Sequence, residues 1–465
     1  MSEDITLSEF TEQQQDGSTD DEELREDGFL TLPRDWKVST LDEVAKEGGL
    51  VDGDWIESAD MDEDGNIQLV QLGHIRQGQF KDEPNRFISE EFAKEENCTV
   101  ISEGDLLISR MQEPILRSCL LPSFDRDSVM AVDIARLQET EDWNRQFLKY
   151  VLNSRPIWKQ GIAWASGTTR KRISRKNMEK LRLPTPSLSE QRKIATVLYT
   201  VDRAIEKTEE IIRQTKTVRD GLRQSALEFG IKETGEFRDL SADMRKETRI
   251  GSIPQRWDFL RLDEVCSDVV DCINTTPEYS DSGIRVILTS EIEDGRYNPE
   301  ESPYVTEEVY KERIRRIEPR PGDVIFTREA PIGEAFKIPE GERLCLGQRT
   351  IQLRPENGTL DSDFLLELLY SEKMQSWFQR VAVGSTTKHM RVGDVEGMKI
   401  PVPSISEQRR IASLLGSQRE YIETNMRYAE QFRRHKRGLV QDLLSGTVRT
   451  TDTNMEVPDK ITQHG

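Results

Sequence analysis

Cysteine, histidine and long apolar runs are scarce in this sequence, and each scarcity excludes a class of protein. Five cysteines in 465 residues form no CxxC pair, so neither a disulfide framework nor a zinc site is indicated. No run of about 18 apolar residues occurs, which argues against a membrane-spanning helix. The first residues, MSEDITLSEF, lack the basic start and apolar core of a signal peptide. We therefore expect reduced thiols and a cytoplasmic location.

Motifs for catalysis are also missing. The chain contains no GxxxxGK[ST] phosphate loop, no HExxH metal motif and no Asn-Pro-Pro-aromatic methyltransferase signature. Its four histidines are scattered, and a lone histidine in a loop is more often a surface residue than a base. We expect no catalytic residue, no metal site and no cofactor bound by this chain, which favours a binding or structural role.

Negative charge is concentrated at one end. The formal net charge is −21, and residues 1–28 hold eleven Asp or Glu against one Arg, a net of −10 that leaves −11 for the remainder. Low apolar content and high charge predict a disordered acidic tail over 1–28. The overall balance is unlike that of most nucleic-acid binders. Net charge, however, does not describe a single face of a large protein.

A long internal repeat organises the rest of the chain. PTPSLSEQRKIATVL, from residue 184, returns as PVPSISEQRRIASLL, from residue 401, with ten of fifteen positions identical and an offset of 217. Each copy begins with a Ser followed three residues later by a Glu, the pattern of a helical capping box, and ends at a Gly suited to a C-cap. We predict long helices over 186–230 and 403–447, so the same structural unit occurs twice.

The apolar residues of both copies recur at steps of three and four, which is typical of a coiled coil. About 40 residues at about 1.5 Å each would span about 60 Å. The residues assigned to this seam and to the motif that opens each helix are Glu190, Gln191, Ile194, Leu198, Ile205, Glu407, Gln408, Ile411, Leu415 and Ile422.

A domain precedes each long helix. LPRDWKVSTLDEV, from residue 32, is echoed by IPQRWDFLRLDEV, from residue 253, and short alternating strands with amphipathic helices follow in both. We predict mixed α/β domains over 29–185 and 253–402, which gives an α/β (α+β) fold with an internal two-fold repeat. A polar linker over 231–252 and a polar tail over 448–465 complete the chain.

Basic and hydroxyl-rich loops lie at equivalent places in the two domains. SGTTRKRIS, from residue 166, corresponds to GSTTKHMRV, from residue 384, and such loops can place N–H groups, hydroxyls and guanidiniums against phosphates. Arg and Gln side chains also suit guanine and adenine in the major groove. A solvated basic surface is the alternative interpretation. The candidate DNA-binding residues are Arg110, Ser166, Thr168, Thr169, Arg170, Lys171, Arg172, Arg328, Gln348, Arg349, Ser385, Thr386, Thr387, Lys388 and Arg391.

The order of a variable domain, a PxPSxSEQRxIA helix, a second variable domain and a second such helix resembles the specificity subunit of type I restriction–modification enzymes. The resemblance covers residues from about 30 to 447. It implies two target recognition domains, each reading one half of a bipartite double-stranded DNA site, with two antiparallel helices as the spacer between them. Half-sites about one helical turn apart, roughly 34–36 Å, suit such an object.

The same resemblance implies the partners. Methyltransferase subunits, two by expectation, dock on the helices, and restriction/translocase subunits join them. S-adenosylmethionine, ATP and Mg would be used by these partners, in a complex that is a site-specific deoxyribonuclease and adenine-specific DNA methyltransferase. The alternative is a coiled-coil protein-interaction scaffold without DNA specificity. The DNA sequence recognised and the spacer length do not follow from the sequence.

Overall fold

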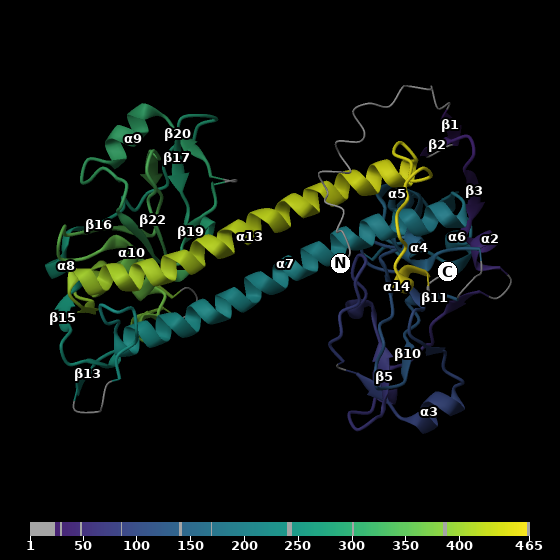
Figure 1. Ribbon diagram of the computed structural model, residues 1–465, viewed down its shortest axis with the longest axis horizontal. Coiled ribbons are helices and arrows are strands. Elements are labelled where there is room, and N and C mark those ends of the chain that lie inside the picture. The colour runs from purple at the N-terminus through teal and green to yellow at the C-terminus, as the bar shows by residue number, and fades with distance from the viewer. Residues whose placement is uncertain are drawn as a thin grey trace. The chain divides into compact units, whose positions relative to one another are not determined.

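The chain folds into two compact units, each of which combines a domain with parts of both long helices. A computed structural model describes residues 24–27, 30–46, 49–84, 86–138, 142–168, 170–239, 244–299, 302–384 and 388–462. Unit 1 comprises Met1–Lys207 and Ala429–Gly465, and unit 2 comprises Thr208–Tyr428. Figure 1 shows that each unit holds strands and short helices beside the two long ones.

The domain of unit 1 is built on two four-stranded sheets. Their strand orders are β6-β5-β10-β7 and β4-β11-β8-β9, and the β12-β3 and β1-β2 pairs stand beside them. The strands are β1 (Leu24–Asp27), β2 (Leu30–Pro33), β3 (Lys37–Thr40), β4 (Leu50–Asp52), β5 (Ile67–Val70), β6 (Phe87–Ile88), β7 (Val100–Ile101), β8 (Leu106–Ser109), β9 (Ser118–Leu120), β10 (Ser128–Met130), β11 (Ile134–Leu137) and β12 (Arg182–Thr185).

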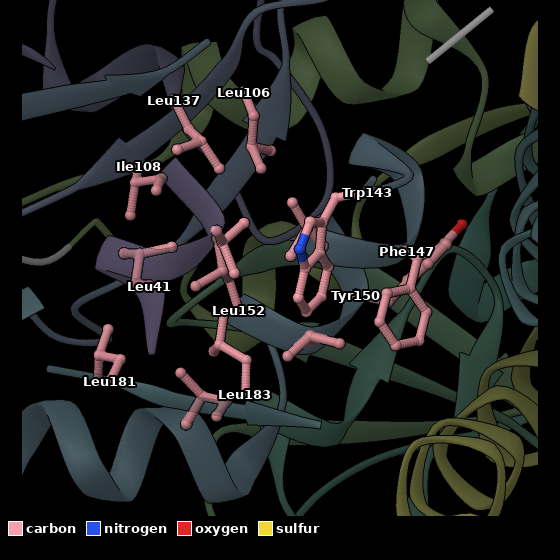
Figure 2. Packing of buried hydrophobic residues seen from close by; sticks show 14 of the residues in the cluster. Leu41, Leu106, Ile108, Leu137, Trp143, Phe147, Tyr150, Leu152, Leu181 and Leu183 are labelled. Atoms are coloured by element: carbon pink, nitrogen blue, oxygen red, sulfur yellow. The ribbon is translucent and has the colours of Figure 1, made fainter. Parts of the chain in front are cut away.

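Helices close the core of this domain. They are α2 (Leu41–Ala45), α3 (Glu90–Glu95), α4 (Arg145–Leu152), α5 (Arg155–Trp164), α6 (Arg175–Met178) and α14 (Asp459–Thr462), with 3-10 turns η1 (Ser58–Asp60) and η2 (Leu72–His74). Side chains of β8, β11, β12, α2 and α4 interdigitate in the largest core of unit 1 (Figure 2). Trp143, Phe147 and Tyr150 are its labelled aromatic side chains.

Unit 2 repeats this plan with differences in strand length. Its sheets run β16-β24-β21-β22 and β20-β17-β23, with the β15-β25, β13-β14 and β18-β19 pairs. The strands are β13 (Arg245–Thr248), β14 (Gly251–Pro254), β15 (Asp258–Arg261), β16 (Cys266–Asp271), β17 (Ile284–Ile287), β18 (Ile292–Glu293), β19 (Arg296–Tyr297), β20 (Tyr304–Val305), β21 (Val324–Arg328), β22 (Ile332–Lys337), β23 (Leu344–Leu346), β24 (Thr350–Pro355) and β25 (Lys399–Val402). The helices are α8 (Leu262–Val265), α9 (Glu307–Arg313), α10 (Ser362–Leu369), α11 (Glu372–Val381) and α12 (Val392–Glu396), with the 3-10 turn η4 (Thr289–Glu291).

The two long helices, α7 (Leu188–Phe229) and α13 (Ile405–Ser445), lie close to their predicted bounds. Gly230 and Gly446 end them with φ of 74° and 73°, in the left-handed region that glycine adopts without strain. Within unit 1, Lys436 near the end of α13 pairs with Asp202 near the start of α7 at 2.5 Å, so the end of one long helix lies beside the start of the other. The mixed α/β organisation and the pair of long helices are confirmed.

The predicted capping box forms only in part at the start of α7. The Ser187 hydroxyl accepts from the backbone N–H of Glu190 at 3.3 Å, as expected. The Glu190 carboxylate instead accepts from Trp36 Nε1 at 3.1 Å and from Arg449 Nε at 2.8 Å. An indole and a guanidinium, both from outside the helix, engage the buried carboxylate in place of a backbone donor, so the box expected there is half formed.

The start of α13 departs from the capping box in a similar way. The Glu407 carboxylate accepts from the backbone N–H of Ile231 at 3.0 Å and pairs with Arg238. The backbone N–H of Glu407 donates to the backbone carbonyl of Ser404 at 2.9 Å. In both copies, therefore, the Glu of the motif joins the helix start to the segment that follows a helix end.

The chain segments outside the two predicted domains carry more structure than their polar composition indicates. Residues 24–27 form β1 and pair with β2, while 1–23 lie outside the described residues. The expected linker over 231–252 contains β13 and the start of β14. The C-terminal segment reaches α14, where the Ile461 side chain is fully buried in the core of unit 1.

A buried ion cluster joins both long helices to the domain of unit 2. Glu367 of α10 accepts from Arg223 Nε of α7 at 3.0 Å and pairs with Arg419 of α13. Arg219 of α7 pairs with Asp294 in the β18-β19 turn at 2.8 Å. Burial by itself raises the pKa of Glu367, but Arg419 and Arg223 outweigh it and hold that pKa below its usual value.

Glu367→Gln should destabilise unit 2 by about 3–5 kcal/mol, because two buried guanidiniums lose their counter-ion. A depressed carboxyl pKa stabilises the fold above the unfolded-state value and loses that contribution as pH falls below about 4.3. Urea unfolding at pH 7 and pH 4 should show a smaller loss on acidification in the variant. Glu372→Gln, an exposed change on α11, should behave as the wild type. Equal unfolding free energies for Glu367→Gln and the wild type at pH 7 would contradict the expectation.

Ile461→Ala should lower the free energy of unfolding of unit 1 by about 2–5 kcal/mol, because a fully buried aliphatic side chain is lost. Chemical denaturation followed by tryptophan fluorescence would measure it, since Trp143 belongs to the same core. The neighbouring Lys460 is exposed, and Lys460→Ala serves as the matched control. If both variants unfold at the same denaturant concentration, the C-terminal segment does not contribute to the core.

Candidate nucleic-acid interface

A buried arginine holds three loops together at one end of the domain of unit 1. Arg110, just after β8, is 6% exposed and forms an ion pair with Asp52 through Nη1 at 2.7 Å. Its Nε donates to the carbonyl of Ile173 at 3.4 Å, and its Nη1 donates to that of Val132 at 3.3 Å. Burial lowers the pKa of the guanidinium, while Asp52 opposes this effect. Arg110, a candidate DNA contact by sequence, therefore lies inside the frame of the site.

The basic loop of unit 1 is a tight turn built on this frame. Ser166 and Arg172 exchange two backbone hydrogen bonds of 2.9 Å each, which closes the loop between them. Gly167 has φ of 100°, and a Cβ there would lie 2.5 Å from the Arg170 carbonyl, so only glycine fits. These two bonds and the glycine define the backbone turn at Ser166 and Gly167.

The basic side chains of this loop differ in their availability. Lys171 pairs with Glu113 at 3.1 Å and Arg172 with Asp133 at 3.2 Å. Arg170 is exposed, as are Ser166 and Thr168. Arg170 is therefore the cation of this loop that is best placed to meet a phosphate.

Unit 2 carries the same frame with other residues on it. Arg328 ends β21, its side chain is 12% exposed, and its Nε lies 3.3 Å from Asp271 Oδ1, as Arg110 lies beside Asp52. The backbone N–H of Met390 donates to the Arg328 carbonyl at 2.9 Å, as Ile173 does to Arg110. The two copies of the repeat therefore build the same arrangement of loops from different residues.

The exposed residues over this second frame come from two loops. Val383 and His389 exchange backbone hydrogen bonds of 3.0 and 2.9 Å, and Lys388 is exposed next to them. Arg349, with φ of 68°, accepts from the Arg328 N–H through its carbonyl at 3.0 Å, which brings the Gln348–Arg349 turn beside the basic loop. Its guanidinium lies 3.5 Å from Glu329 and remains half exposed.

The remaining candidates are placed as follows. Arg391 is exposed at the start of α12. Thr169, Ser385, Thr386 and Thr387 lie outside the described residues, so their predicted role stays a prediction. The apolar members of the helix set are buried, with Ile194 and Leu198 in the core of unit 1 and Ile411 and Leu415 in that of unit 2, and with Ile205 and Ile422 also below 10% exposure.

The two glutamines of the helix motif have a local role. Gln191 Oε1 accepts from the backbone N–H of Asn144, which caps α4, at 2.9 Å. Gln408 does the same for Asp361, which caps α10, at 2.8 Å. Both glutamines therefore fix the first turn of a domain helix against the first turn of a long helix.

Sequence reasoning missed several residues that belong to the site. Asp52 and Asp271, the counter-ions of the buried arginines, end strands with no local signal for this role. Arg313 donates to the carbonyls of Ile273 and Thr275 at 3.0 and 2.9 Å, which fixes the loop after β16. Arg315 and Arg316, just after Arg313, are exposed. The run RIRR, next to a Pro-Gly turn, is the signal that could have identified them.

The charged residues beside the two buried arginines differ between the domains. In unit 1 the loop after β4 carries Asp54, Glu57 and Asp60, together with the exposed Trp55. The loop after β16 in unit 2 lies against Arg313 and Arg316 instead. Carboxylates thus belong to the loop after β4 in unit 1, whereas arginines fix the loop after β16 in unit 2.

The described residues also bear on metal, membrane and thiol sites. No group of three or more His, Cys, Asp or Glu side chains there could hold a metal ion. In the same part of the chain, no helix is long and apolar enough to cross a membrane. The five cysteines are buried and free, and burial raises the thiol pKa of Cys119 and Cys266 to about 12.

Comparison with known proteins places these features in a family. The type I restriction modification DNA specificity domain matches twice, over residues 33–216 and 254–426. The MjaVIII specificity subunit of a type I restriction enzyme from Methanocaldococcus jannaschii is 23% identical over 451 residues, 93% of this chain and 98% of the relative. The EcoBI specificity subunit from Escherichia coli is 23% identical over 341 residues, 70% of this chain and 71% of the relative.

Solved structures share the fold. The S subunit of a type I restriction–modification system from M. genitalium has a TM-score of 0.55 at 14% identity, covering 90% of this chain and 98% of its own. A chain from a study of type I R-M complex assembly and conformational transition has a TM-score of 0.51 at 17% identity, covering 90% and 99%. The repeated frame, the paired long helices and the two family matches lead to one conclusion: this chain belongs to the type I restriction–modification DNA specificity family.

Proposed function

We propose that this chain is the DNA-recognition subunit of a type I restriction–modification enzyme and has no catalytic activity alone. Each domain reads one half of a bipartite site in double-stranded DNA, and the helix pair sets the spacing between the half-sites. The observation that carries this proposal is the pair of matched frames, Arg110 with Asp52 and Arg328 with Asp271, under loops whose exposed residues differ.

Physical chemistry supports a division of labour within each site. Exposed cations such as Arg170 and Lys388 suit phosphate contacts, which position a protein on DNA without reading sequence. Arg and Gln side chains, as at Gln348 and Arg349, suit the edges of guanine and adenine in the major groove. Because the exposed residues differ between the units, we propose two different half-sites.

The proposal extends to the assembly. Methyltransferase subunits, two in number, dock on the helix pair, and restriction/translocase subunits complete the enzyme. S-adenosylmethionine, ATP and Mg serve those partners in methylation of adenine and cleavage of DNA. The family membership of the chain and the names of its relatives, which are specificity subunits, support this assignment.

Arg170→Ala should weaken DNA binding about equally for all sequences and reduce the salt dependence by about one phosphate contact. Arg110→Ala should instead lower the stability of unit 1 by about 3 kcal/mol, because Asp52 loses its counter-ion. Fluorescence anisotropy across a salt series and urea unfolding separate the two effects. Lys460→Ala removes an exposed positive charge of α14 and serves as the control. An unchanged salt dependence in Arg170→Ala would exclude a phosphate contact there.

Exchange of residues 253–400 for the corresponding domain of another specificity subunit should change one half-site and leave the other intact. Sequencing of methylated adenines, in cells that carry the methyltransferase subunit, would read both half-sites at once. A motif that stays the same while the protein partners change would favour the scaffold alternative over DNA recognition. The wild-type chain with the same methyltransferase subunit is the reference.

A further inference from the structure

The C-terminal segment of the chain covers a groove in unit 1. After α13 it passes α7, where Lys193 Nζ donates to the carbonyls of Thr451 and Thr453 at 2.9 and 2.8 Å. It reaches α14 (Figure 1). There, Asn144 Nδ2 donates to the Ile461 carbonyl at 2.7 Å. Val457 and Ile461 join the core of unit 1. The segment therefore seals the junction between the first turns of α4 and α7.

The repeat places four residues of unit 2 at the positions of four residues of this groove. Asn144 and Asp361 both cap a domain helix, and the glutamine of the SEQ motif holds each from the long helix at 2.9 and 2.8 Å. The offset of 217 then pairs Gln146 with Asp363 and, on the long helices, Ala195 with Ala412 and Thr196 with Ser413. The walls of the two grooves are thus equivalent.

Their exposure differs. Asn144 and Ala195 are fully buried, and Gln146 and Thr196 are 5% exposed. In unit 2, Ser413 is exposed, and the side chains of Asp361 and Asp363 are 22% and 53% exposed. Asp361, Asp363, Arg409, Ala412, Ser413 and Gly416 line an open groove of about 390 Å³.

Gly416 leaves open space on the α13 side of this groove. Gly416 stands where unit 1 has Tyr199, which packs against the core, and a Cβ added at Gly416 would meet nothing within 4 Å. A glycine inside a helix lowers helix stability by about 1 kcal/mol relative to alanine, so Gly416 is unfavourable for α13 on its own. An aliphatic side chain resting on Gly416 and Ala412 would fill the open space.

The polar side chains at the rim of the groove determine which hydrogen-bonding groups fit there. Asp361 Oδ1 accepts from the N–H groups of Asp363 and Phe364 at 3.1 Å each, whereas Oδ2 lies 3.9 Å from the Arg409 guanidinium. Asp363 pairs with Lys337 at 2.5 Å. Where Asn144 donates to a carbonyl, Asp361 can only accept, so the segment that fits here brings a hydrogen-bond donor beside its aliphatic side chain.

We propose that this groove is a docking site for a short segment of a partner protein, seated on unit 2 as residues 457–461 are seated on unit 1. The C-terminal segment of a second copy is a poor occupant, because it would first have to expose its own Ile461, which is fully buried. The site rests on the proposed function, in which the partner is the methyltransferase subunit. Its segment presents an aliphatic residue next to an N–H, lysine or arginine donor.

Ser413→Trp in the full-length chain fills the groove from an exposed position, so folding should be unaffected, and circular dichroism verifies this. Binding of the purified methyltransferase subunit, measured by titration calorimetry, should weaken by about tenfold or more, because a central contact is blocked. Glu340→Trp, an exposed change elsewhere in unit 2, is the matched control and should bind as the wild type does. Equal affinity for Ser413→Trp and the wild type would overturn the docking site alone.

A photo-crosslinking amino acid at position 413 identifies the occupant in the assembled complex. The expected product joins this chain to the methyltransferase subunit, and peptide mapping should find an aliphatic residue beside a donor. Crosslinks only between copies of this chain, or none while the complex forms, would overturn the site. A wild-type chain that binds no methyltransferase subunit would overturn the proposed function itself, together with the site that depends on it.

Discussion

A buried carboxylate at the start of each long helix is the constraint on which the rest of the fold depends. Glu190 and Glu407 have side chains only 3% and 0% exposed, and a charge so enclosed is tolerated only with partners. Those partners come from the segment after a helix end, Arg449 in unit 1 and Arg238 in unit 2. The end of one long helix must therefore meet the start of the other, which makes the pair antiparallel within each unit.

The same use of buried charge explains how related frames can carry different surfaces. Arg110 and Arg328 hold the backbone of three loops from inside, so the outward side chains of those loops contribute little to folding. Exposed positions of this kind can change without loss of the frame. A recognition protein benefits from this separation, because new specificity does not require a new fold.

The two units share a buried arginine–aspartate frame but differ in the charged residues beside it. Acidic residues follow β4 in unit 1, whereas arginines gather beside β16 in unit 2. The C-terminal segment covers one groove and leaves its counterpart open. A duplicated unit therefore does not imply duplicated surfaces.

The sequence by itself determined the architecture. The repeat shows that one unit occurs twice, and the heptad spacing and the glycine caps are local signals that specify two long helices and their ends. It also located the loops of the candidate interface through their glycines, hydroxyls and basic residues. Only the tertiary structure decided that Arg110 belongs to the frame while Arg170 faces solvent, that Glu190 bonds to Trp36 and Arg449, and that Ile461 is core. Each of these depends on a partner tens to hundreds of residues away, and neither composition nor periodicity encodes which distant group will satisfy a buried charge or cover an apolar groove.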